Sequence, residues 1–250
     1  MASKTRLLFD ADMMLYIACQ RTEKVIEWDE GLFTLHCFLP EAAAMFDEHV
    51  MELTSLVLEH YNVDGEYEII MCLSDEVNFR KQLWSEYKAN REHKRRPVCY
   101  RAMREWIQTY YTTLIYPRLE ADDTIGITAT DTDIIISGDK DFRTLPFRFY
   151  DFMRNEYSEH TEEQANYWHL FQTLIGDPTD NYKGCPKVGE VKAKKILDED
   201  CSWNAVVKAY EANGSDEDTA LLNARLAFIL RDGYYNKKTK KVKLWKPNKN

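Results

Sequence analysis

The sequence has no closely spaced cysteine pair, no long apolar run and no histidines in a catalytic spacing, and each absence argues against a class of protein. Its six cysteines are scattered without a CxxC pair, which argues against a zinc site or a disulfide framework and favours a reducing compartment, the cytoplasm. The absence of a run of about 18 apolar residues predicts no membrane span. The first residues reach Asp10 without an apolar core, so we expect no secretory signal. The six histidines show no spacing typical of a Ser/His/Asp catalytic set.

Basic residues are concentrated in three segments, although the net charge of the chain is −9. Residues 80–104 carry +7, residues 183–195 carry +4 and residues 237–249 carry +7, which leaves −27 for the remainder. A polyanion responds to local potential, so this pattern is compatible with binding to DNA or RNA. For any single basic run, a solvated face is the simpler explanation.

Short apolar runs alternate with helical stretches in the first two thirds of the chain. Residues 6–9, 68–73 and 133–137 are rich in Leu and Ile and are each followed by an acid, which is typical of buried parallel strands. Helical patterns follow Asp12 and begin again at Pro40 and at Tyr100, the last extending to residue 114. The alternation predicts an α/β fold with a mainly parallel central sheet. After about residue 160 the pattern is helical, with no further strand until a basic hairpin at residues 233–245.

Acidic residues follow the predicted strands and form dense clusters. Ligands of α/β sheets bind beyond the carboxyl ends of the strands, where we expect these acids to converge. The segment LEADDTIG, residues 119–126, has three acids within four positions, for which a helix N-terminus is an alternative explanation. The segments SGDKDF and GDPTDN repeat a spaced pair of aspartates. The complete set is Asp10, Asp75, Glu120, Asp122, Asp123, Asp139, Asp141, Asp177 and Asp180.

These nine carboxylates indicate a metal-dependent chemistry. Ionised carboxylates close together raise one another's pKa values, and divalent cations relieve the repulsion. A ligand set made only of oxygen favours Mg²⁺ or Mn²⁺ over Zn²⁺. Two such ions about 3.5–4 Å apart stabilise both the attacking and the leaving oxygen in phosphodiester hydrolysis. Asp12 stays outside this set, because we expect it to be the N-cap of the helix that follows.

Five motifs occur in the order found in a known family: LLFDAD, NFRKQLWSEYKANR, LEADDTIG, IIISGDKDF and LIGDPTDNYKGCPKVGEVKAKKIL. Together, from about Leu7 to Leu197, they resemble the 5′–3′ exonuclease and flap-endonuclease family, most closely its short bacteriophage members. The resemblance implies a PIN-like nuclease domain over residues 1–165, with an arch segment at about 80–104. It also implies a helix-hairpin-helix (H2TH-type) DNA-binding region over residues 166–232, followed by a basic hairpin or tail over residues 233–250.

The resemblance also implies a role for each motif residue. Lys88 and Arg91 match the cations that reach the scissile phosphate, where they would neutralise developing charge. Trp84 and Tyr87 could stack on bases, with core packing as the alternative. The first metal ion would be held by Asp10, Asp75 (with Glu76 as a rival), Glu120 and Asp122, and the second by Asp139, Asp141, Asp177 and Asp180, with Asp123 near both. The expected DNA-binding residues are Arg80, Lys81, Tyr87, Lys183, Gly184, Lys187, Gly189, Lys192, Lys194 and Lys195.

The implied cofactors are two Mg²⁺ ions, which Mn²⁺ can replace, and the sequence permits a K⁺ ion at the helix-hairpin-helix. The implied partner of a monomeric enzyme is DNA with 5′ ends, flaps or junctions, with RNA·DNA hybrids as a further substrate, in the host cytoplasm if the protein comes from a phage. Two alternatives are open. A haloacid-dehalogenase-type phosphatase is suggested by FDAD and SGDKD, but Met13 replaces the Thr or Val expected after Asp12. A non-catalytic DNA-junction binder would not need the complete set of acids.

Overall fold

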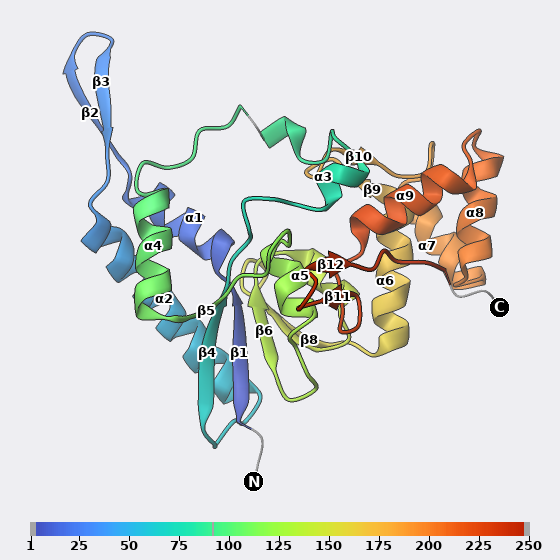
Figure 1. Cartoon of the computed structure of the whole chain (residues 1–250), viewed down its shortest axis with the longest axis horizontal. Helices are drawn as coiled ribbons and strands as arrows, with labels where there is room; N and C mark the ends of the chain where they lie inside the picture. Colours follow the sequence, from blue (N-terminus) through green and yellow to red (C-terminus); the bar gives the residue numbers. More distant parts are fainter. Residues whose placement is uncertain (1–3, 92, 248–250) are drawn as a thin grey trace.

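The computed structural model of the chain describes residues 4–91 and 93–247 (Figure 1). Glu92 in the expected arch, Lys249, and the outermost residues of the expected 1–165 and 233–250 regions lie outside the described residues. Within the described part, an α/β unit precedes a mainly helical region. The division of the chain at residues 165 and 232 stays a prediction.

A six-stranded sheet is the centre of the α/β unit. Its strand order is β5-β4-β1-β6-β7-β8, and every neighbouring pair is parallel except β7 with β8. This arrangement confirms the predicted α/β fold with a mainly parallel sheet. The strands are β1 (Thr5–Asp10), β4 (Tyr67–Cys72), β5 (Thr112–Leu114), β6 (Ile134–Ser137), β7 (Arg148–Asp151) and β8 (Glu156–Glu159).

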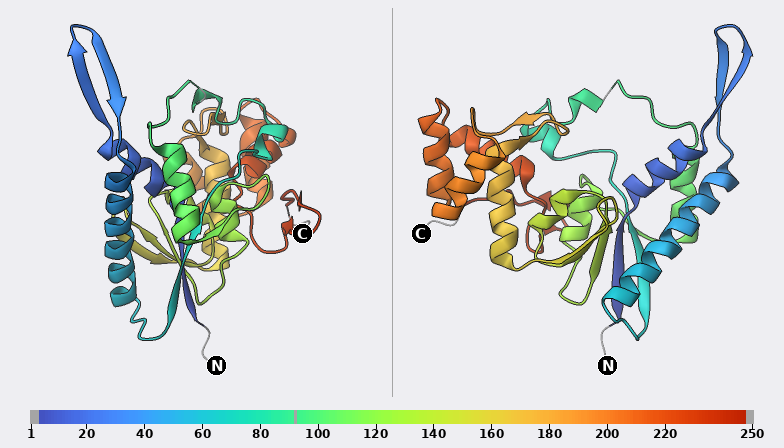
Figure 2. Two further views of the ribbon diagram at one scale, coloured as in Figure 1. Left: turned by 60° about the vertical axis from the view of Figure 1, so that its left-hand side comes forward. Right: turned by 180° about the vertical axis from the view of Figure 1, so that it is seen from behind.

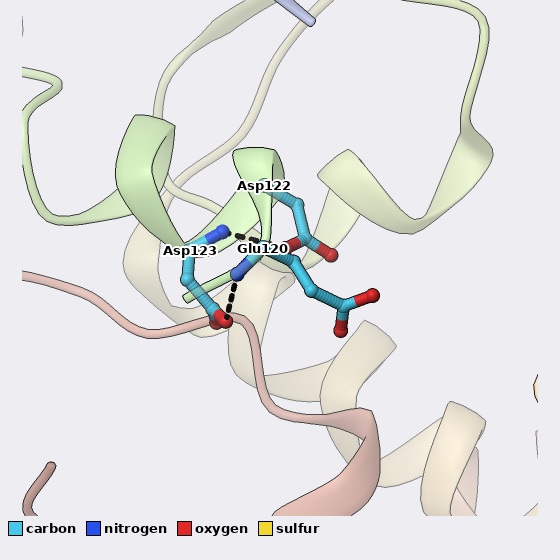
Figure 3. A group of neighbouring side chains, drawn as sticks. All are labelled: Glu120, Asp122 and Asp123. Carbon is cyan, nitrogen blue, oxygen red and sulfur yellow. Dashed lines mark hydrogen bonds between the residues drawn. The ribbon is translucent and has the colours of Figure 1, made fainter. Parts of the chain in front are cut away.

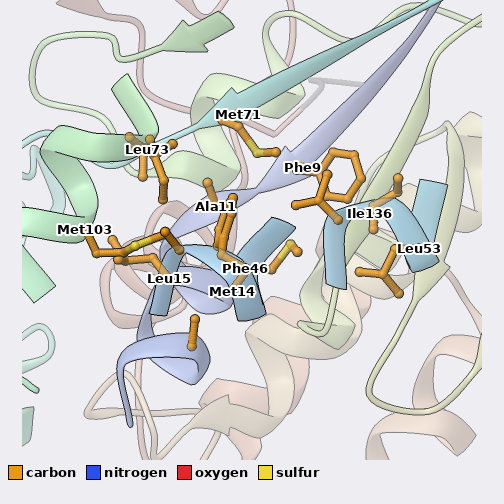
Figure 4. Close-up of a cluster of buried hydrophobic side chains, with 14 of the residues drawn as sticks. Phe9, Ala11, Met14, Leu15, Phe46, Leu53, Met71, Leu73, Met103 and Ile136 are labelled. Carbon is orange, nitrogen blue, oxygen red and sulfur yellow. The ribbon is translucent and has the colours of Figure 1, made fainter. Parts of the chain in front are cut away.

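Helices cover both faces of the sheet. On one face Leu7 and Phe9 belong to a core shared with α1 (Ala11–Thr22), α2 (Leu39–His60) and α4 (Tyr100–Tyr110), part of which is drawn in Figure 4. On the other face Leu8 packs in a second core with α5 (Ala121–Gly126). Because successive side chains of a strand point to opposite faces, burial on both faces explains the unbroken apolar run of β1.

The helical region has a core of its own, built around residues such as Leu174, Val206 and Tyr210. It consists of α6 (Glu162–Ile175), α7 (Glu190–Glu199), α8 (Trp203–Ala212) and α9 (Glu217–Ala227). Two short strands, β9 (Gly176–Asp177) and β10 (Tyr182–Lys183), lie between α6 and α7. Figure 2 shows this region on the opposite side of the molecule from α2 and α4.

The expected arch segment connects the two sides of the molecule. It begins with α3 (Arg80–Leu83), which contacts α9, and continues through a 3₁₀ turn, η1 (Ala89–Arg91). From there the chain crosses to the start of α4 on the far side of the sheet (Figures 1 and 2). The cations of this segment are therefore carried over the edge where the parallel strands end.

Several elements differ from the sequence-based expectations. The hairpin of β2 (Lys24–Asp29) and β3 (Leu32–His36) was not predicted, because it projects from the body and buries no alternating face (Figure 2). Its Trp28 and Phe33 are 67% and 60% exposed. The helix expected to reach residue 114 ends at Tyr110, and β5 follows it. The antiparallel β7–β8 pair and the short β9–β10 pair were also missed.

The basic hairpin near the C-terminus was predicted correctly. It is formed by β11 (Tyr235–Asn236) and β12 (Lys241–Val242), which pair antiparallel. Among the residues that the structure describes, no helix combines the length and the apolar character needed to cross a bilayer.

Candidate active site

Some of the predicted acids lie at the carboxyl ends of parallel strands, and others come from α5 and from β9. Asp10 is the last residue of β1 and Asp139 follows β6, where its side chain accepts the N–H of Asp141 at 2.9 Å and caps the 3₁₀ helix η2 (Lys140–Thr144). Glu120 is the N-cap of α5, and Asp177 ends β9. Asp10 and Asp139 are close because β1 and β6 are neighbours in the sheet, whereas Glu120 and Asp177 come from outside the sheet.

The cluster at residues 120–123 is both a helix start and a group of potential metal ligands (Figure 3). Asp122 accepts the backbone N–H of Asp123 at 2.6 Å, and Asp123 accepts that of Glu120 at 3.4 Å. One carboxylate oxygen from each of the three lies within 4.8 Å of the others. The helix N-terminus that the sequence left as an alternative is therefore present, and it holds the acids together.

Arg80 anchors this cluster from inside the protein. Its guanidinium donates to both oxygens of Asp123, at 2.6 and 2.8 Å, and to Glu120 at 3.1 Å. Two carbonyl groups at the end of α9, those of Leu226 and Phe228, accept its remaining hydrogens. Arg80 is only 1% exposed, so the expectation that it contacts DNA is wrong. A buried arginine beside a buried carboxylate satisfies that carboxylate and leaves no group for a ligand in solvent.

Tyr87 also has an internal role. It is 2% exposed, and its hydroxyl lies 3.0 Å from Glu120 and 2.8 Å from Asp180. Base stacking by Tyr87 is therefore excluded in this structure, and the alternative of core packing applies. Trp84, three residues earlier, is 40% exposed.

Lys88 and Arg91 reach the acids from the arch. The ammonium of Lys88 bonds to Glu120 and lies 3.5 Å from Asp180, and Arg91 donates to Asp180 at 2.6 Å. The backbone reinforces the contact, because the N–H of Lys88 donates to the carbonyl of Asp180 at 2.9 Å. Lys88 has a φ of 56°, in the left-handed region that non-glycine residues seldom adopt. The contacts with Glu120 and Asp180 hold the ammonium beside these two acids.

The acids near α5 differ in electrostatics although they are neighbours. Burial alone would raise the pKa of the Glu120 carboxyl, but Lys88 and Arg80 lower it to about 2. Burial and the adjacent Asp123 and Glu120 carboxylates raise the pKa of Asp122 well above its ordinary value. Asp122 is therefore the member of this cluster that most needs a further cation.

The acids beyond β6 form a second group, in which Asp180 pairs with Lys88 and Arg91 and the pKa values of Asp139 and Asp141 are raised. Burial, together with Asp139 and Asp177, raises the pKa of Asp141 to about 8. Burial also raises the pKa of Asp139. The amide of Gln172 on α6 approaches Asp141 at 3.5 Å and Asp177 at 3.4 Å. This neutral donor supplies hydrogen bonds but no charge.

Asp10 is connected to Asp139 of the second group through Ser137. The Ser137 hydroxyl donates to Asp10 at 2.8 Å and accepts the N–H of Asp139 at 3.0 Å. Burial and the nearby Asp12 raise the pKa of Asp10 to about 7. The N-cap of α1 is Asp10, so the prediction that Asp12 caps this helix is wrong.

Asp12 instead ties three segments together behind the acids. It accepts the backbone N–H of Ser74 at 2.7 Å and lies 3.2 Å from the guanidinium of Arg104. Asp75, which follows Ser74 in the sequence, accepts the N–H of Arg118 at 2.7 Å through one oxygen. The rival Glu76 is exposed.

The basic residues expected to bind DNA lie mostly on the surface. Between the end of α6 at Ile175 and the start of α7 at Glu190, the connection contains β9 and β10. Gly184 is needed for packing, since a Cβ there would lie 2.3 Å from the Leu174 carbonyl oxygen. Gly189, the N-cap of α7, is open to solvent. The exposed cations are Lys81, Lys183, Lys187, Lys192, Lys194 and Lys195.

Four neutral or basic residues of the site were not identified from the sequence: Ser74, Ser137, Gln172 and Arg104. Ser137 is the last residue of β6 and Ser74 lies two residues after β4, so their place at the end of a strand was the only available signal. Gln172 lies within a helix and has no local motif. Its contact with Asp141 depends on tertiary packing.

Comparisons with known proteins match this geometry. A family model described as "5′-3′ exonuclease, N-terminal resolvase-like domain" matches residues 41–167, just over half of the chain. An exonuclease of Escherichia phage T7 is 26% identical in an alignment covering 96% of this chain and 93% of that protein. The flap endonuclease Xni of Shewanella oneidensis is 29% identical over 49% of this chain and 54% of its own length.

Solved structures share the fold. The 5′-exonuclease of phage T5 with bound zinc ions superimposes with a TM-score of 0.61 at 18% identity, covering 90% of this chain and 89% of that chain. The phage T5 flap endonuclease with DNA and metal ions gives a TM-score of 0.59 at 17% identity, with the same coverages. The family model, the fold and the order of the acidic motifs agree, and the chain belongs to the 5′-3′ exonuclease family.

Proposed function

We propose that this protein is a two-metal nuclease that hydrolyses phosphodiester bonds of DNA near a 5′ end or at a flap junction. The observation that carries the proposal is the convergence of acids from β1, α5, β6 and β9 beneath two cations of the arch, Lys88 and Arg91. The named relatives are an exonuclease and a flap endonuclease, which supports the same reaction. Primer removal or repair during DNA replication would require this reaction.

The donor atoms fit divalent ions of the hard class. They are carboxylate oxygens, and the raised pKa values of Asp10, Asp122 and Asp141 identify positions where added positive charge would be stabilising. We assign one Mg²⁺ ion to Asp10, Asp75, Glu120 and Asp122, and a second to Asp139, Asp141, Asp177 and Asp180. Asp123 is better explained as the partner of Arg80 and of the Leu230 N–H, at 3.0 Å, than as a ligand.

Metal ions bound here would activate water and stabilise charge on the reacting phosphate. The chain itself supplies orientation and further positive charge. Lys88 and Arg91 stand on the side of the acids that faces the arch, where they can contact a phosphate group. Tyr87 and Arg80 hold the carboxylates in place from below. The exposed lysines of residues 183–195 would hold duplex DNA by its backbone, independent of sequence.

The decisive assay follows the products from 5′-labelled flapped, gapped and blunt DNA, with Mg²⁺ and with chelator. We expect short products from the 5′ end in Mg²⁺ and none in chelator. In Asp122→Ala and Asp139→Ala, cleavage should fall by at least about 10³-fold while DNA binding persists. The exposed Asp131→Ala is the matched control. Cleavage in chelator, or full activity of both variants, would refute the two-metal proposal.

Lys88 is tested separately because its proposed role is to neutralise charge that develops on the reacting phosphate, and not to bind a metal ion. Lys88→Ala should slow single-turnover cleavage by more than about tenfold, or about 1.4 kcal/mol. Lys208→Ala, an exposed lysine of α8, is the control. An unchanged rate would remove Lys88 from the reaction. Hydrolysis of small phosphate monoesters without action on DNA would instead favour the phosphatase alternative.

A further inference from the structure

A folded basic hairpin lies beside the acidic site, in a part of the chain beyond the matched family model. The lysine hairpin, defined as β11, β12 and the turn between them, has four exposed lysines: Lys237, Lys238, Lys240 and Lys241. No acid occurs in residues 233–250. Among the described residues, no ion pair is formed by these lysines.

The hairpin is ordered by its own backbone and by its underside. The side chain of Asn236 accepts the N–H groups of Lys238 and Thr239 at 3.0 and 2.9 Å, and its carbonyl accepts that of Lys240 at 2.7 Å. Beneath the turn, Tyr235 is only 9% exposed and packs with Leu119 and Phe228. A solubilising tail needs no such scaffold, because disordered lysines are equally soluble.

The hairpin is attached to the loop that also holds a predicted metal ligand. The Tyr235 hydroxyl donates to the carbonyl of Pro117 at 3.0 Å, and Lys237 lies 5.0 Å above the ring of Tyr116. The next two residues of that loop, Arg118 and Leu119, bond to Asp75. Figure 1 accordingly shows β11 and β12 beside α5, the helix that begins at the acidic cluster.

We propose that the lysine hairpin is a second DNA-binding surface, which holds the phosphate backbone of a strand extending from the acidic site. Four exposed cations of one sign on a rigid turn match the dense negative charge of a nucleic-acid backbone. The aromatic residues beneath it are buried or partly buried, and this surface binds the backbone without reading bases. The proposal rests on the proposed nuclease function, because it needs DNA in the site.

The test compares two triple variants of the full chain. Lys238→Gln/Lys240→Gln/Lys241→Gln removes three charges from the hairpin, and Lys4→Gln/Lys24→Gln/Lys208→Gln removes three exposed charges elsewhere. Affinity for flapped DNA with long duplex arms is measured by fluorescence anisotropy in chelator over a range of salt. For the hairpin variant, the slope of log Kd against log salt should fall by about 2–3 and the affinity by about fivefold or more. The control should behave like wild type.

Two further measurements decide the outcome. At saturating DNA, the single-turnover cleavage rate of the hairpin variant should equal that of wild type. Shortening the duplex arms to about one helical turn should remove the difference in affinity between the two proteins. If the hairpin variant keeps the wild-type slope and affinity while wild type still cleaves DNA, the hairpin is a solvated surface and this proposal fails alone. If wild type neither binds nor cleaves DNA, the proposed function fails with it.

Discussion

The two halves of the acidic centre solve the problem of crowded negative charge in different ways. Near α5, Arg80 and Lys88 are built into the cluster and lower the pKa of Glu120 to about 2. Beyond β6, the pKa of Asp141 rises to about 8 because burial and two neighbouring aspartates outweigh the surface cation of Lys140. In each half the protein supplies cations to some acids and not to others: near α5 it neutralises Glu120 and Asp123 but leaves the pKa of Asp122 raised, and beyond β6 it pairs Lys88 and Arg91 with Asp180 but leaves the pKa of Asp141 raised.

The two halves also differ in what their acids contribute: some stabilise the fold, and others form a candidate metal site. The pair of Arg80 and Asp123 is buried and connects α3, α5 and the end of α9, so it belongs to the framework of the fold. The group of Asp139, Asp141 and Asp177 adds electrostatic repulsion to the folded protein without metal. Such strain is retained where a ligand relieves it, which is the expected property of a metal site.

The largest effect on stability should come from removing Arg80, the buried cation that pairs with Asp123 and Glu120 near α5. Arg80→Met leaves Asp123 buried without its cation, which should lower the free energy of unfolding by about 3–5 kcal/mol in urea denaturation. The matched control is Arg101→Met, because Arg101 is 91% exposed and pairs with the exposed Glu105. The double variant Arg80→Met/Asp123→Asn should recover part of the loss. A loss below about 1 kcal/mol in the single variant would contradict the framework role of this pair.

The opposite effect on the free energy of unfolding is expected at Asp141, in the group of acids beyond β6. Asp141→Asn removes a strained carboxyl, so in chelator at neutral pH it should raise the free energy of unfolding by about 1 kcal/mol or more. The same change should abolish DNA cleavage. Asp131→Asn, on the surface, should change stability by no more than about 0.5 kcal/mol. Destabilisation by Asp141→Asn in chelator would show that this half is not strained.

The pH dependence of stability follows from the same carboxyls. A carboxyl whose pKa is raised on folding binds more protons in the folded state, so stability falls as pH rises towards the folded pKa. In chelator, the wild-type protein should therefore be less stable at pH 8 than at pH 6.5, with Asp10 and Asp141 as the main causes. The slope should decrease in Asp141→Asn. Equal slopes in the two proteins would assign the effect to other groups.

A smaller effect on stability is expected from a substitution that adds a cation beside Asp141 and Asp177. Gln172→Lys places an ammonium beside Asp141 and Asp177, which should stabilise the metal-free protein by up to about 1 kcal/mol. It should also reduce the rise in Tm caused by Mn²⁺, since the lysine and the metal compete for the same carboxylates. The exposed Gln108→Lys on α4 should change neither quantity. An unchanged response to Mn²⁺ in Gln172→Lys would place the ion elsewhere.

Sequence reasoning predicted the parts of this protein whose signal is local. Strands β1, β4 and β6 were visible because burial on both faces leaves an apolar run, and the acids after them mark the carboxyl ends of the strands. The β2–β3 hairpin has no such signal, because its residues are exposed on both faces.

Contacts between distant residues were not predictable in this way. The sequence around a basic residue does not show whether its side chain binds a phosphate group or a carboxylate inside the protein. Arg80 proved to contact Asp123, which is 43 positions away. The neutral partners Ser137 and Gln172 carry no motif at all, and only the packing of β6 and α6 reveals them.

The most direct test of the central claim is the number of Mn²⁺ ions bound per chain, measured by isothermal titration at neutral pH without DNA. The proposal of one metal site in each group of acids predicts two ions for the wild-type protein and the loss of one ion in Asp141→Asn, with the fold of the variant intact. The absence of saturable Mn²⁺ binding by the wild-type protein would contradict the account.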